Sequence, residues 1–548
     1  MKLLLALLAT ATLFAQDYDE VIANGRIVDG TGAPWHFGDL AIRNDRIAKI
    51  TPAGRLAQAT AKRRIDARGK VIAPGFIDIQ SHVENNLLLG DTRLISRVTQ
   101  GITTEIMGES TTDAPTNAKT RLLSGKTKYE FDGPHGFDRW MKTIEKRQAS
   151  ANFGSFVGAG TIRAFGKGMA MGQATAAELG EMKRAMREAM EDGAFGLASA
   201  LIYPPGSYAD TAELVDIAKE IAPYGGVYIS HLRSEGERLV EAVEEAITIG
   251  RQAQVPVEIY HLKAVGRDNW AKMPAVIEQI NAARAGGLDV QANMYPYAAS
   301  GTGLTACLPD WTAADGKLWE NLTSPGTRQK ILAEMTTPSD QWESRCLQAT
   351  PEGVLLVGLR RPEHQQFLGK RLSEVAAALK KPWPETVLDL LSAERQRIST
   401  IYFVISEKNV ALQLALPWIK VSTDSGSSNP EVDKAPTHPR GYGTFPRVLG
   451  KYVREEKVMS LEEAIRKMTS AVANRLSLPD RGVLRENMLA DVVVFDPATV
   501  KDNSTFDQPH QLSTGVEHVF VNGVAVVSEG KHTGAKPGRI VRGPGHKN

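Results

Sequence analysis

The sequence contains little cysteine, no long apolar run and almost no net charge, and each shortage excludes a class of protein. Two cysteines in 548 residues are too few for a cysteine-ligated zinc cluster or a disulfide framework. A net charge of +2 gives no electrostatic attraction to nucleic acid. No segment has the roughly 20 apolar residues that a membrane-spanning helix needs. What remains is a large globular protein, for which a hydrophobic content of 42% is ordinary.

The first residues have the pattern of a secretory signal peptide. The stretch "MKLLLALLATATLFAQ" joins Lys2 to a short apolar run and ends at Ala15 and Gln16. The other interpretation is a buried N-terminal strand. We expect residues 1–15 to be a signal peptide and the protein to be secreted or periplasmic. That compartment would permit a disulfide between Cys307 and Cys346, but the sequence cannot show that they meet, and two inert buried thiols are the alternative.

The two ends of the chain share a pattern of short strands and tight turns. Asn24-Gly25 and Asn522-Gly523 mark hairpin turns between runs such as "YDEVIANGRIVDG" and "GVEHVFVNGVAVVSEGK". Neither end has enough strands to form a sandwich alone. We therefore assign residues 16–70 and 483–548 to one small β-sandwich module that both ends build together.

Eight apolar strand-like runs alternate with helical stretches through the middle of the chain. They are "VIAPGFIDI", "GITTEIMG", "NFGSFVGAG", "AFGLASAL", "GGVYISHL", "VPVEIYHLK", "LDVQANMY" and "WIKVSTD". Buried strands in βα alternation predict an α/β fold with a parallel sheet, and eight repeats predict a (β/α)8, TIM-like barrel over residues 71–482. The last two runs lie far apart. We expect roughly residues 298–415 to form an insertion, a partly helical lid over the barrel mouth.

Polar side chains collect where these runs end, which is where the active site of such a barrel lies. Gln80 and His82 are two residues apart and so would point to the same side of an extended chain. The other polar residues at these ends are Glu109, Ser110, His231, His261, Tyr295 and Asp424. Imidazole and carboxylate groups together suit zinc, and we expect a zinc site there rather than separate core histidines.

Several stretches resemble the D-aminoacylases (N-acyl-D-amino-acid deacylases) of the amidohydrolase superfamily, in the same order along the chain. They include "PGFID", "GVYISHLRSEGE", "HLKAVG", "YPY", "HPRGYGTFPRVLG" and "ADVVVFDPATV". The resemblance covers nearly the whole chain after the signal peptide, except parts of residues 300–400. It implies that His231 and His261 hold the tightly bound zinc, that Asp424 carries the proton and that His82 polarises the carbonyl.

Two positions depart from the family pattern. Gln80 replaces the first histidine of the strand-one pair, and Ser110 replaces a bridging cysteine. A serine hydroxyl is a weak zinc ligand, so we nominate the neighbouring Glu109 as the third ligand. The alternative is that Glu109 binds a backbone group or an arginine. We expect one tightly bound Zn²⁺ and a second position that is empty or weakly filled, with Gln80 orienting water or substrate.

The resemblance also assigns contacts to the substrate carboxylate. Residues of the required types stand at all four positions, Tyr203, Lys263, Tyr295 and Arg440. Independently, Lys263 follows His261 by two residues and would face the same pocket on a strand, where it could bind an anion or form an inter-strand salt bridge. Arg440 could bind a carboxylate through two parallel hydrogen bonds.

These observations predict zinc-dependent hydrolysis of N-acyl-D-amino acids to a carboxylate and a free D-amino acid. The expected partner is this small molecule alone, with no nucleic acid and no membrane span. Two alternatives stay open. One is a zinc hydrolase of cyclic amides or isopeptides on the same barrel, and the other is a non-catalytic binding protein with a degraded metal site. The sequence does not determine the acyl group, the side chain or the oligomeric state.

Overall fold

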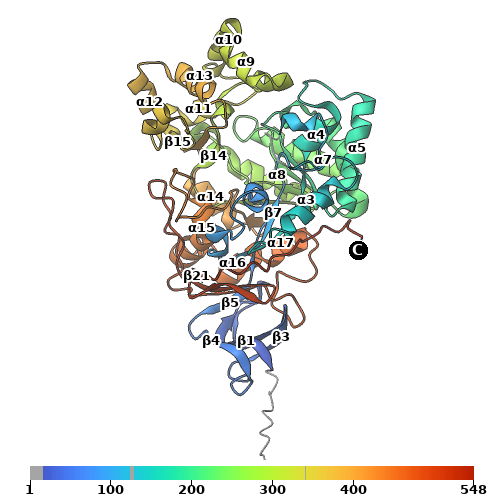
Figure 1. Ribbon diagram of the computed structural model, residues 1–548, viewed down its shortest axis with the longest axis vertical. Helices are drawn as coiled ribbons and strands as arrows, with labels where there is room; N and C mark the ends of the chain where they lie inside the picture. Colours follow the sequence, from blue (N-terminus) through green and yellow to red (C-terminus); the bar gives the residue numbers. More distant parts are fainter. Residues whose placement is uncertain (1–16, 124–128, 340, 548) are drawn as a thin grey trace, which may run out of the picture.

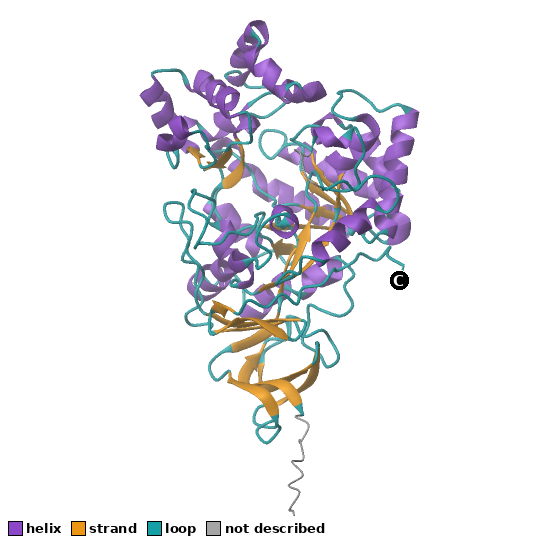
Figure 2. Cartoon of the chain, viewed as in Figure 1, coloured by secondary structure: helices purple, strands orange, loops and turns teal. Residues whose placement is uncertain are grey.

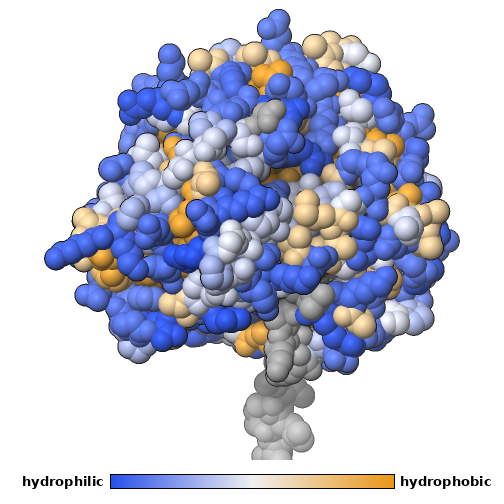
Figure 3. Space-filling model, turned by 90° about the horizontal axis from the view of Figure 1, so that it is seen from above, coloured by the Kyte–Doolittle hydropathy of each residue, from blue (hydrophilic) through white to orange (hydrophobic). Residues whose placement is uncertain are grey.

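The computed structural model describes residues 17–123, 129–339 and 341–547, and the predicted signal peptide at 1–15 lies outside them. Figure 1 shows a large sheet at one end of the molecule and the helices within residues 318–394 at the other. The face seen in Figure 3 is mainly hydrophilic, with hydrophobic residues in small scattered groups. Within the described part of the chain, no helix combines the length and apolarity needed to cross a bilayer.

Strands from both ends of the chain form one nine-stranded sheet, seen at the bottom of Figure 2. Its main path runs β21-β20-β19-β18-β5-β1-β2-β3, and β4 pairs with β1. Its strands are β1 Tyr18–Ile27, β2 His36–Arg43, β3 Arg46–Pro52, β4 Ala61–Asp66, β5 Val71–Pro74, β18 Val492–Phe495, β19 Val516–Val521, β20 Val524–Ser528 and β21 Lys531–His532. The N- and C-terminal parts meet where β5 pairs antiparallel with β18.

All eight predicted runs contain strands. They are β6 Phe76–Asp78, β7 Ile102–Met107, β8 Asn152–Ser155 with β9 Val157–Gly158, β10 Gly196–Ala200, β11 Val227–His231, β12 Val257–Ile259, β13 Val290–Met294 and β17 Ile419–Val421. The first run is split at Gly75, because β5 joins the nine-stranded sheet and only β6 continues toward the site. A side chain at Gly75 would collide with Thr103, which explains why the chain crosses there through a glycine.

These strands form two parallel sheets, β6-β7-β8 and β17-β13-β12-β11-β10-β9. The sheets are linked by the short step from β8 to β9 and, at the other side, by a parallel bridge between Ser81 and Ser425. The ladders between described residues therefore do not run continuously around a closed ring. The strands are buried on both faces, as expected for parallel strands covered by helices.

Helices lie between and after the strands. Those of the βα alternation are α4 Ala159–Lys167, α5 Ala176–Glu191, α6 Thr211–Ala218, α7 Leu239–Ala253 and α8 Met273–Ala285. The other α-helices outside the insertion are α1 Glu84–Leu88, α2 Ile95–Val98, α3 Gly136–Glu145, α15 Arg440–Arg447, α16 Leu461–Met468 and α17 Ser470–Arg475. A capping box between Thr175 and Glu178 begins α5.

The region predicted as an insertion has its own small sheet, ordered β14-β16-β15, and several helices. The strands are β14 Ser300–Gly303, β15 Val354–Leu356 and β16 Ser399–Tyr402. The helices are α9 Leu318–Thr323, α10 Pro325–Met335, α11 Arg345–Ala349, α12 Leu372–Leu379, α13 Trp383–Glu394 and α14 Glu407–Leu414. Cys307, at the end of the 3-10 turn η5 Leu304–Cys307, forms a disulfide with Cys346 of α11. This resolves the choice that the sequence left open.

Candidate metal centre and active site

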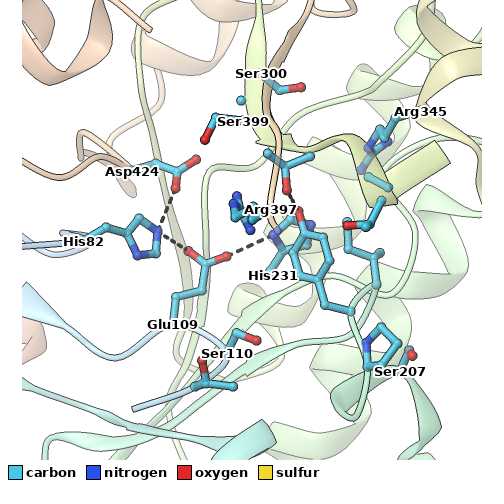
Figure 4. A pocket seen from close by; sticks show the side chains of 18 of the residues that line it. His82, Glu109, Ser110, Ser207, His231, Ser300, Arg345, Arg397, Ser399 and Asp424 are labelled. Carbon is cyan, nitrogen blue, oxygen red and sulfur yellow. Dashed lines mark hydrogen bonds and ion pairs between the residues drawn. The ribbon is translucent and has the colours of Figure 1, made fainter. Parts of the chain in front are cut away.

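The polar residues predicted at the strand ends come together at one cavity of about 910 Å³. The cavity is lined by nine of the predicted site residues, His82, Glu109, Tyr203, His231, His261, Lys263, Tyr295, Asp424 and Arg440. Figure 4 shows the chain of contacts from Asp424 through His82 and Glu109 to His231. Gln80 is not part of the cavity wall, so its position gives no support to the predicted contact with substrate.

A buried arginine holds the strand ends beneath the cavity. Arg97 of α2 has no exposed side-chain surface and donates hydrogen bonds to Glu105 at 2.8 and 2.9 Å and to Asp78. It also donates to the Thr423 hydroxyl at 2.5 Å, and the backbone N–H of Thr423 donates to Asp78 at 3.1 Å. The ends of β6, β7 and β17 are thereby fixed to one another. The residues that follow them are Gln80, Glu109 and Asp424.

Glu109 lies at the centre of two possible metal sites. Its Oε1 is 3.0 Å from Nδ1 of His231 and 3.4 Å from Nε2 of His261. Its Oε2 is 3.4 Å from Nε2 of His82, which is 3.0 Å from Oδ1 of Asp424. The ligand atoms of Glu109, His231 and His261 lie within 4.8 Å of one another, and so do those of His82, Glu109 and Asp424. The first set has the two imidazoles and one carboxylate of a catalytic zinc site, so the residues present fit this metal.

The Gln80 amide contacts the carboxylate that both sites share. Its Nε2 donates to Glu109 Oε2 at 2.6 Å, and its side chain is buried. The Glu109 oxygen on the side of His82 and Asp424 therefore already accepts a hydrogen bond from the Gln80 amide. A neutral donor there competes with a second cation for that oxygen, and the empty or weakly filled second position stays a prediction. The strand ends at Asp78, yet Gln80 and His82 do point to the same carboxylate, as their spacing predicts.

The charges of the site are strongly coupled. Burial opposes ionisation of Glu109, but the neighbouring His261 and the hydrogen bond from His231 hold its pKa well below the ordinary value. Burial also opposes ionisation of Asp424, but the Arg440 guanidinium and His261 keep its pKa below the ordinary value. Burial lowers the pKa of His231, which favours the neutral imidazole that a metal requires. Asp424 is therefore ionised near neutral pH and can accept a proton.

Lys263 lines the same cavity as His261, as predicted, but the strand alternation on which that prediction rested is absent. β12 ends at Ile259, and His261 has a φ of +33°, so the two side chains do not alternate along a strand. Lys263 nevertheless reaches His261, with its Nζ 2.7 Å from Nδ1. It also forms a buried ion pair with Glu235. Lys263 is thus already paired with a carboxylate. This resembles the inter-strand salt bridge that the sequence left open as the alternative to anion binding.

The other predicted substrate residues surround the same space. Arg440 donates to Asp424 Oδ2 at 2.6 Å and lies over the ring of Tyr295 at 4.6 Å. The Tyr295 hydroxyl is buried and has no hydrogen-bond partner among the described residues. The Tyr203 hydroxyl bonds to Thr302 of β14 at 2.7 Å, and burial raises its pKa to about 12. The Arg440 guanidinium is therefore bound to Asp424, and its contact with a substrate carboxylate stays a prediction.

Three residues at the site were not predicted. Glu235 lies close to His231 and His261, and Arg345 of the insertion forms an ion pair with Glu235. His438 is buried beside Arg440, and its Nδ1 accepts a hydrogen bond from the backbone N–H of Arg440 at 3.1 Å. Glu235 follows His231 by four residues in "SHLRSEGE", and a carboxylate so close to a strand-end histidine could have been noticed. Arg345 gives no such signal, because 110 residues separate it from Glu235.

Known proteins that are similar to this chain identify its family. Residues 355–527 match the model of the Amidohydrolase family. The D-aminoacylase of Alcaligenes xylosoxydans xylosoxydans is 33% identical over 530 residues, which cover 96% of this chain and 98% of that protein. This chain belongs to the D-aminoacylase family. The resemblance predicted from the motifs is confirmed, and with it an amidohydrolase of the TIM-barrel type.

Two solved structures of the family are similar throughout. One is a D-aminoacylase described as having a binuclear metal centre, with one-metal activation and second-metal attenuation. It has a TM-score of 0.80 and 31% identity, and covers 96% of this chain and 100% of its own. The other is the N-acyl-D-glutamate deacylase of Bordetella bronchiseptica with zinc and a phosphonate inhibitor. It has a TM-score of 0.78 and 30% identity, with 96% and 99% covered.

Proposed function

We propose that this protein is a zinc-dependent N-acyl-D-amino-acid deacylase that releases a carboxylate and a free D-amino acid. The observation that carries the proposal is the Glu109, His231 and His261 cluster beside an ionised Asp424 in one cavity. Membership of the D-aminoacylase family supports the linear amide and the D configuration. A zinc ion bound there supplies Lewis acidity and lowers the pKa of a water toward neutrality.

The protein side chains then have separate tasks. Asp424 accepts the proton of the attacking water and passes it to the leaving nitrogen, since it is ionised and opens on the cavity. Its hydrogen bond to His82 strongly raises the pKa of that imidazole despite burial, with a further contribution from Glu109. A protonated His82 can donate a hydrogen bond to the substrate carbonyl oxygen as negative charge develops there.

A chiral hydrolysis panel tests this function. Purified zinc-loaded protein is given N-acetyl-D- and N-acetyl-L-amino acids, cyclic imides and isopeptides, and the products are separated by chiral chromatography. We expect free D-amino acids from the N-acetyl-D series alone. Cleavage of the cyclic or isopeptide substrates instead would favour the alternative hydrolase, and no cleavage with zinc bound would favour a binding protein.

The same proposal includes the architecture and location of the chain. We infer that the eight strands act as one barrel, that the nine-stranded sheet acts as its β-sandwich module, and that residues 298–415 act as a lid. We also infer that residues 1–15 export the protein to the periplasm or beyond. The disulfide between Cys307 and Cys346 supports export, because disulfides persist mainly in oxidising compartments.

Arg440 is expected to recognise the substrate carboxylate. Arg440→Met should lower kcat/KM for N-acetyl-D-amino acids more than for the matching amides, which lack the carboxylate. The excess loss should be roughly 30-fold, equivalent to about 2 kcal/mol of transition-state stabilisation. Both substrates should also lose activity on the acidic side. Removing the guanidinium lets the pKa of Asp424 rise, so the acidic limb of the pH profile moves to higher pH. Equal losses on both substrates would assign Arg440 to Asp424 alone.

Arg397 predicts a preference for an acidic substrate side chain. It lines the cavity, and within the described residues it has no carboxylate partner. Each of the other cavity cations has one, namely Arg233 with Glu245, Lys263 and Arg345 with Glu235, and Arg440 with Asp424. We expect kcat/KM to be higher for N-acetyl-D-glutamate than for N-acetyl-D-glutamine. Arg397→Met should reduce the ratio of these two kcat/KM values roughly fivefold, equivalent to about 1 kcal/mol.

The control for this measurement is Arg395→Met, two residues away and not in the cavity wall, which should leave the glutamate-to-glutamine ratio unchanged. A wild-type enzyme that prefers the neutral substrate would contradict the assignment of Arg397.

A further inference from the structure

The two metal-site imidazoles are held between two carboxylates. His231 and His261 turn one ring nitrogen each toward Glu109. Their other ring nitrogens lie near Glu235, with His261 Nδ1 3.3 Å from Oε1 and His231 Nε2 3.6 Å from Oε2, which is beyond hydrogen-bond distance. Lys263, the ion-pair partner of Glu235, places its Nζ 2.7 Å from the same His261 Nδ1. Glu235 is only 3% exposed. A carboxylate on the far side of a ligating histidine fixes the orientation of the ring, and removal of such a group typically weakens metal binding 10- to 100-fold.

The insertion supplies the partner that holds Glu235 in place. Arg345, the first residue of α11, forms an ion pair with Glu235 Oε2 and is itself 3% exposed. Its Nη1 donates to Gln348 Oε1 at 2.6 Å, which fixes the guanidinium from the other side. Lys263 pairs with the second oxygen, Oε1. Glu235 is therefore fixed on one side by the barrel and on the other by the insertion.

A second residue of the same segment attaches the insertion to the loop that carries Glu235. The Glu343 carboxylate accepts hydrogen bonds from the backbone N–H groups of Glu235 at 3.3 Å, Gly236 at 3.2 Å and Glu237 at 3.0 Å. It also accepts one from the Ser234 hydroxyl. This loop directly follows β11, whose last residue is His231. Glu343 thus binds the backbone, and Arg345 binds the side chain, of the same short loop.

The disulfide fixes this segment within the insertion. Cys346 is the neighbour of Arg345, and its partner Cys307 lies 39 residues earlier, just after β14. Both cysteines are fully buried. The bridge joins α11 to η5, whose Thr305 and Ala306 line the cavity. In the sequence, helices α9 and α10 separate η5 from α11. Without the disulfide, only packing would hold α11 against η5.

We infer that Glu343 and Arg345 are positioning residues that set the affinity of the barrel for its metal by orienting Glu235, and that the Cys307–Cys346 disulfide keeps them in place. The inference rests on the proposed function only in requiring that Glu109, His231 and His261 hold zinc. The insertion is then more than a cover over the cavity, because it completes the surroundings of the metal ligands.

Zinc affinity, measured by competition with a chromophoric chelator, tests the inference without any substrate. Arg345→Met in the full-length protein should weaken zinc binding about 10- to 100-fold, and Arg345→Lys should restore part of the loss. The matched control is Arg328→Met, which removes another arginine–carboxylate pair within the insertion, Arg328 with Asp389, and should leave zinc affinity unchanged. Wild-type affinity in Arg345→Met would overturn the inference.

The disulfide is tested by the double variant Cys307→Ser/Cys346→Ser. It should weaken zinc binding, and its effect should not add to that of Arg345→Met, because both changes release the same contact. If this variant does not fold, as judged by thermal unfolding, the Arg345 and Glu343→Gln variants still decide the role of the segment. Full zinc affinity in a folded disulfide-free protein would show that the bridge is not needed.

These outcomes separate this inference from the proposed function. If Arg345→Met loses zinc affinity and the wild-type protein hydrolyses no N-acyl-D-amino acid, the inference is supported and the proposed function is refuted. Hydrolysis together with unchanged zinc affinity in that variant would do the reverse.

Discussion

Asp424→Asn should lower kcat by roughly two to four orders of magnitude, the usual contribution of a general acid–base group. Asp424 accepts from Arg440 at 2.6 Å and lies 3.0 Å from His82, and its carboxylate is ionised because the guanidinium outweighs the cost of burial. Asparagine keeps the shape and one acceptor oxygen but cannot take a proton. The measurement is steady-state hydrolysis of an N-acetyl-D-amino acid, with zinc content and thermal unfolding determined on the same sample.

The matched control is Asp113→Asn. Asp113 also lines the cavity, but it belongs to neither of the two metal-ligand clusters. We expect zinc content and folding to be close to wild type in both variants, and the large loss of kcat only in Asp424→Asn. Near-wild-type turnover in Asp424→Asn would remove this residue from the mechanism. An equal loss in Asp113→Asn would point to a general effect of charge in the cavity.

Much of the fold could be predicted because parallel strands buried on both faces appear as continuous apolar runs. This is why β13 and β17 were both found although the insertion separates them by more than a hundred residues. Pairing between them is directly observed, Ala292 with Ile419. The exact ends of the strands could not be predicted. The split at Gly75 arises because β5 and β6 pair in different sheets, and the close approach of Thr103 there is a tertiary contact with no local signal.

The site residues were predictable where a strand end places them, and not where the insertion does. His231, His261 and Asp424 follow apolar runs, so the barrel geometry alone brings them together. Arg345 reaches the site through a helix and a disulfide, neither of which the sequence determines. Lys263 lines the cavity as predicted, but not through strand alternation, because the left-handed backbone at His261 ends that alternation.

Glu109→Gln should remove the tightly bound zinc. Glu109 is the one residue that both candidate metal clusters share, and its Oε1 faces His231 and His261 while its Oε2 faces His82. Glutamine offers a neutral oxygen and a donor N–H group in place of an anion, so the zinc ligand set loses its only negative charge. We expect zinc, counted by mass spectrometry after dialysis, to fall from about one per chain to well below one, and hydrolysis to fall with it.

Ser110→Ala is the matched control, because Ser110 stands where the family pattern has its bridging ligand. If the neighbouring carboxylate has taken over that role, this variant keeps its zinc and most of its activity. Zinc loss in Ser110→Ala with retention in Glu109→Gln would reverse the assignment.

The number of zinc ions bound by the wild-type protein tests the second metal position as well. The Gln80 amide already donates to Glu109 Oε2 at 2.6 Å, so a second ion would have to displace that hydrogen bond to reach the oxygen. Two zinc ions surviving dialysis would show that His82, Glu109 and Asp424 hold a metal in spite of Gln80.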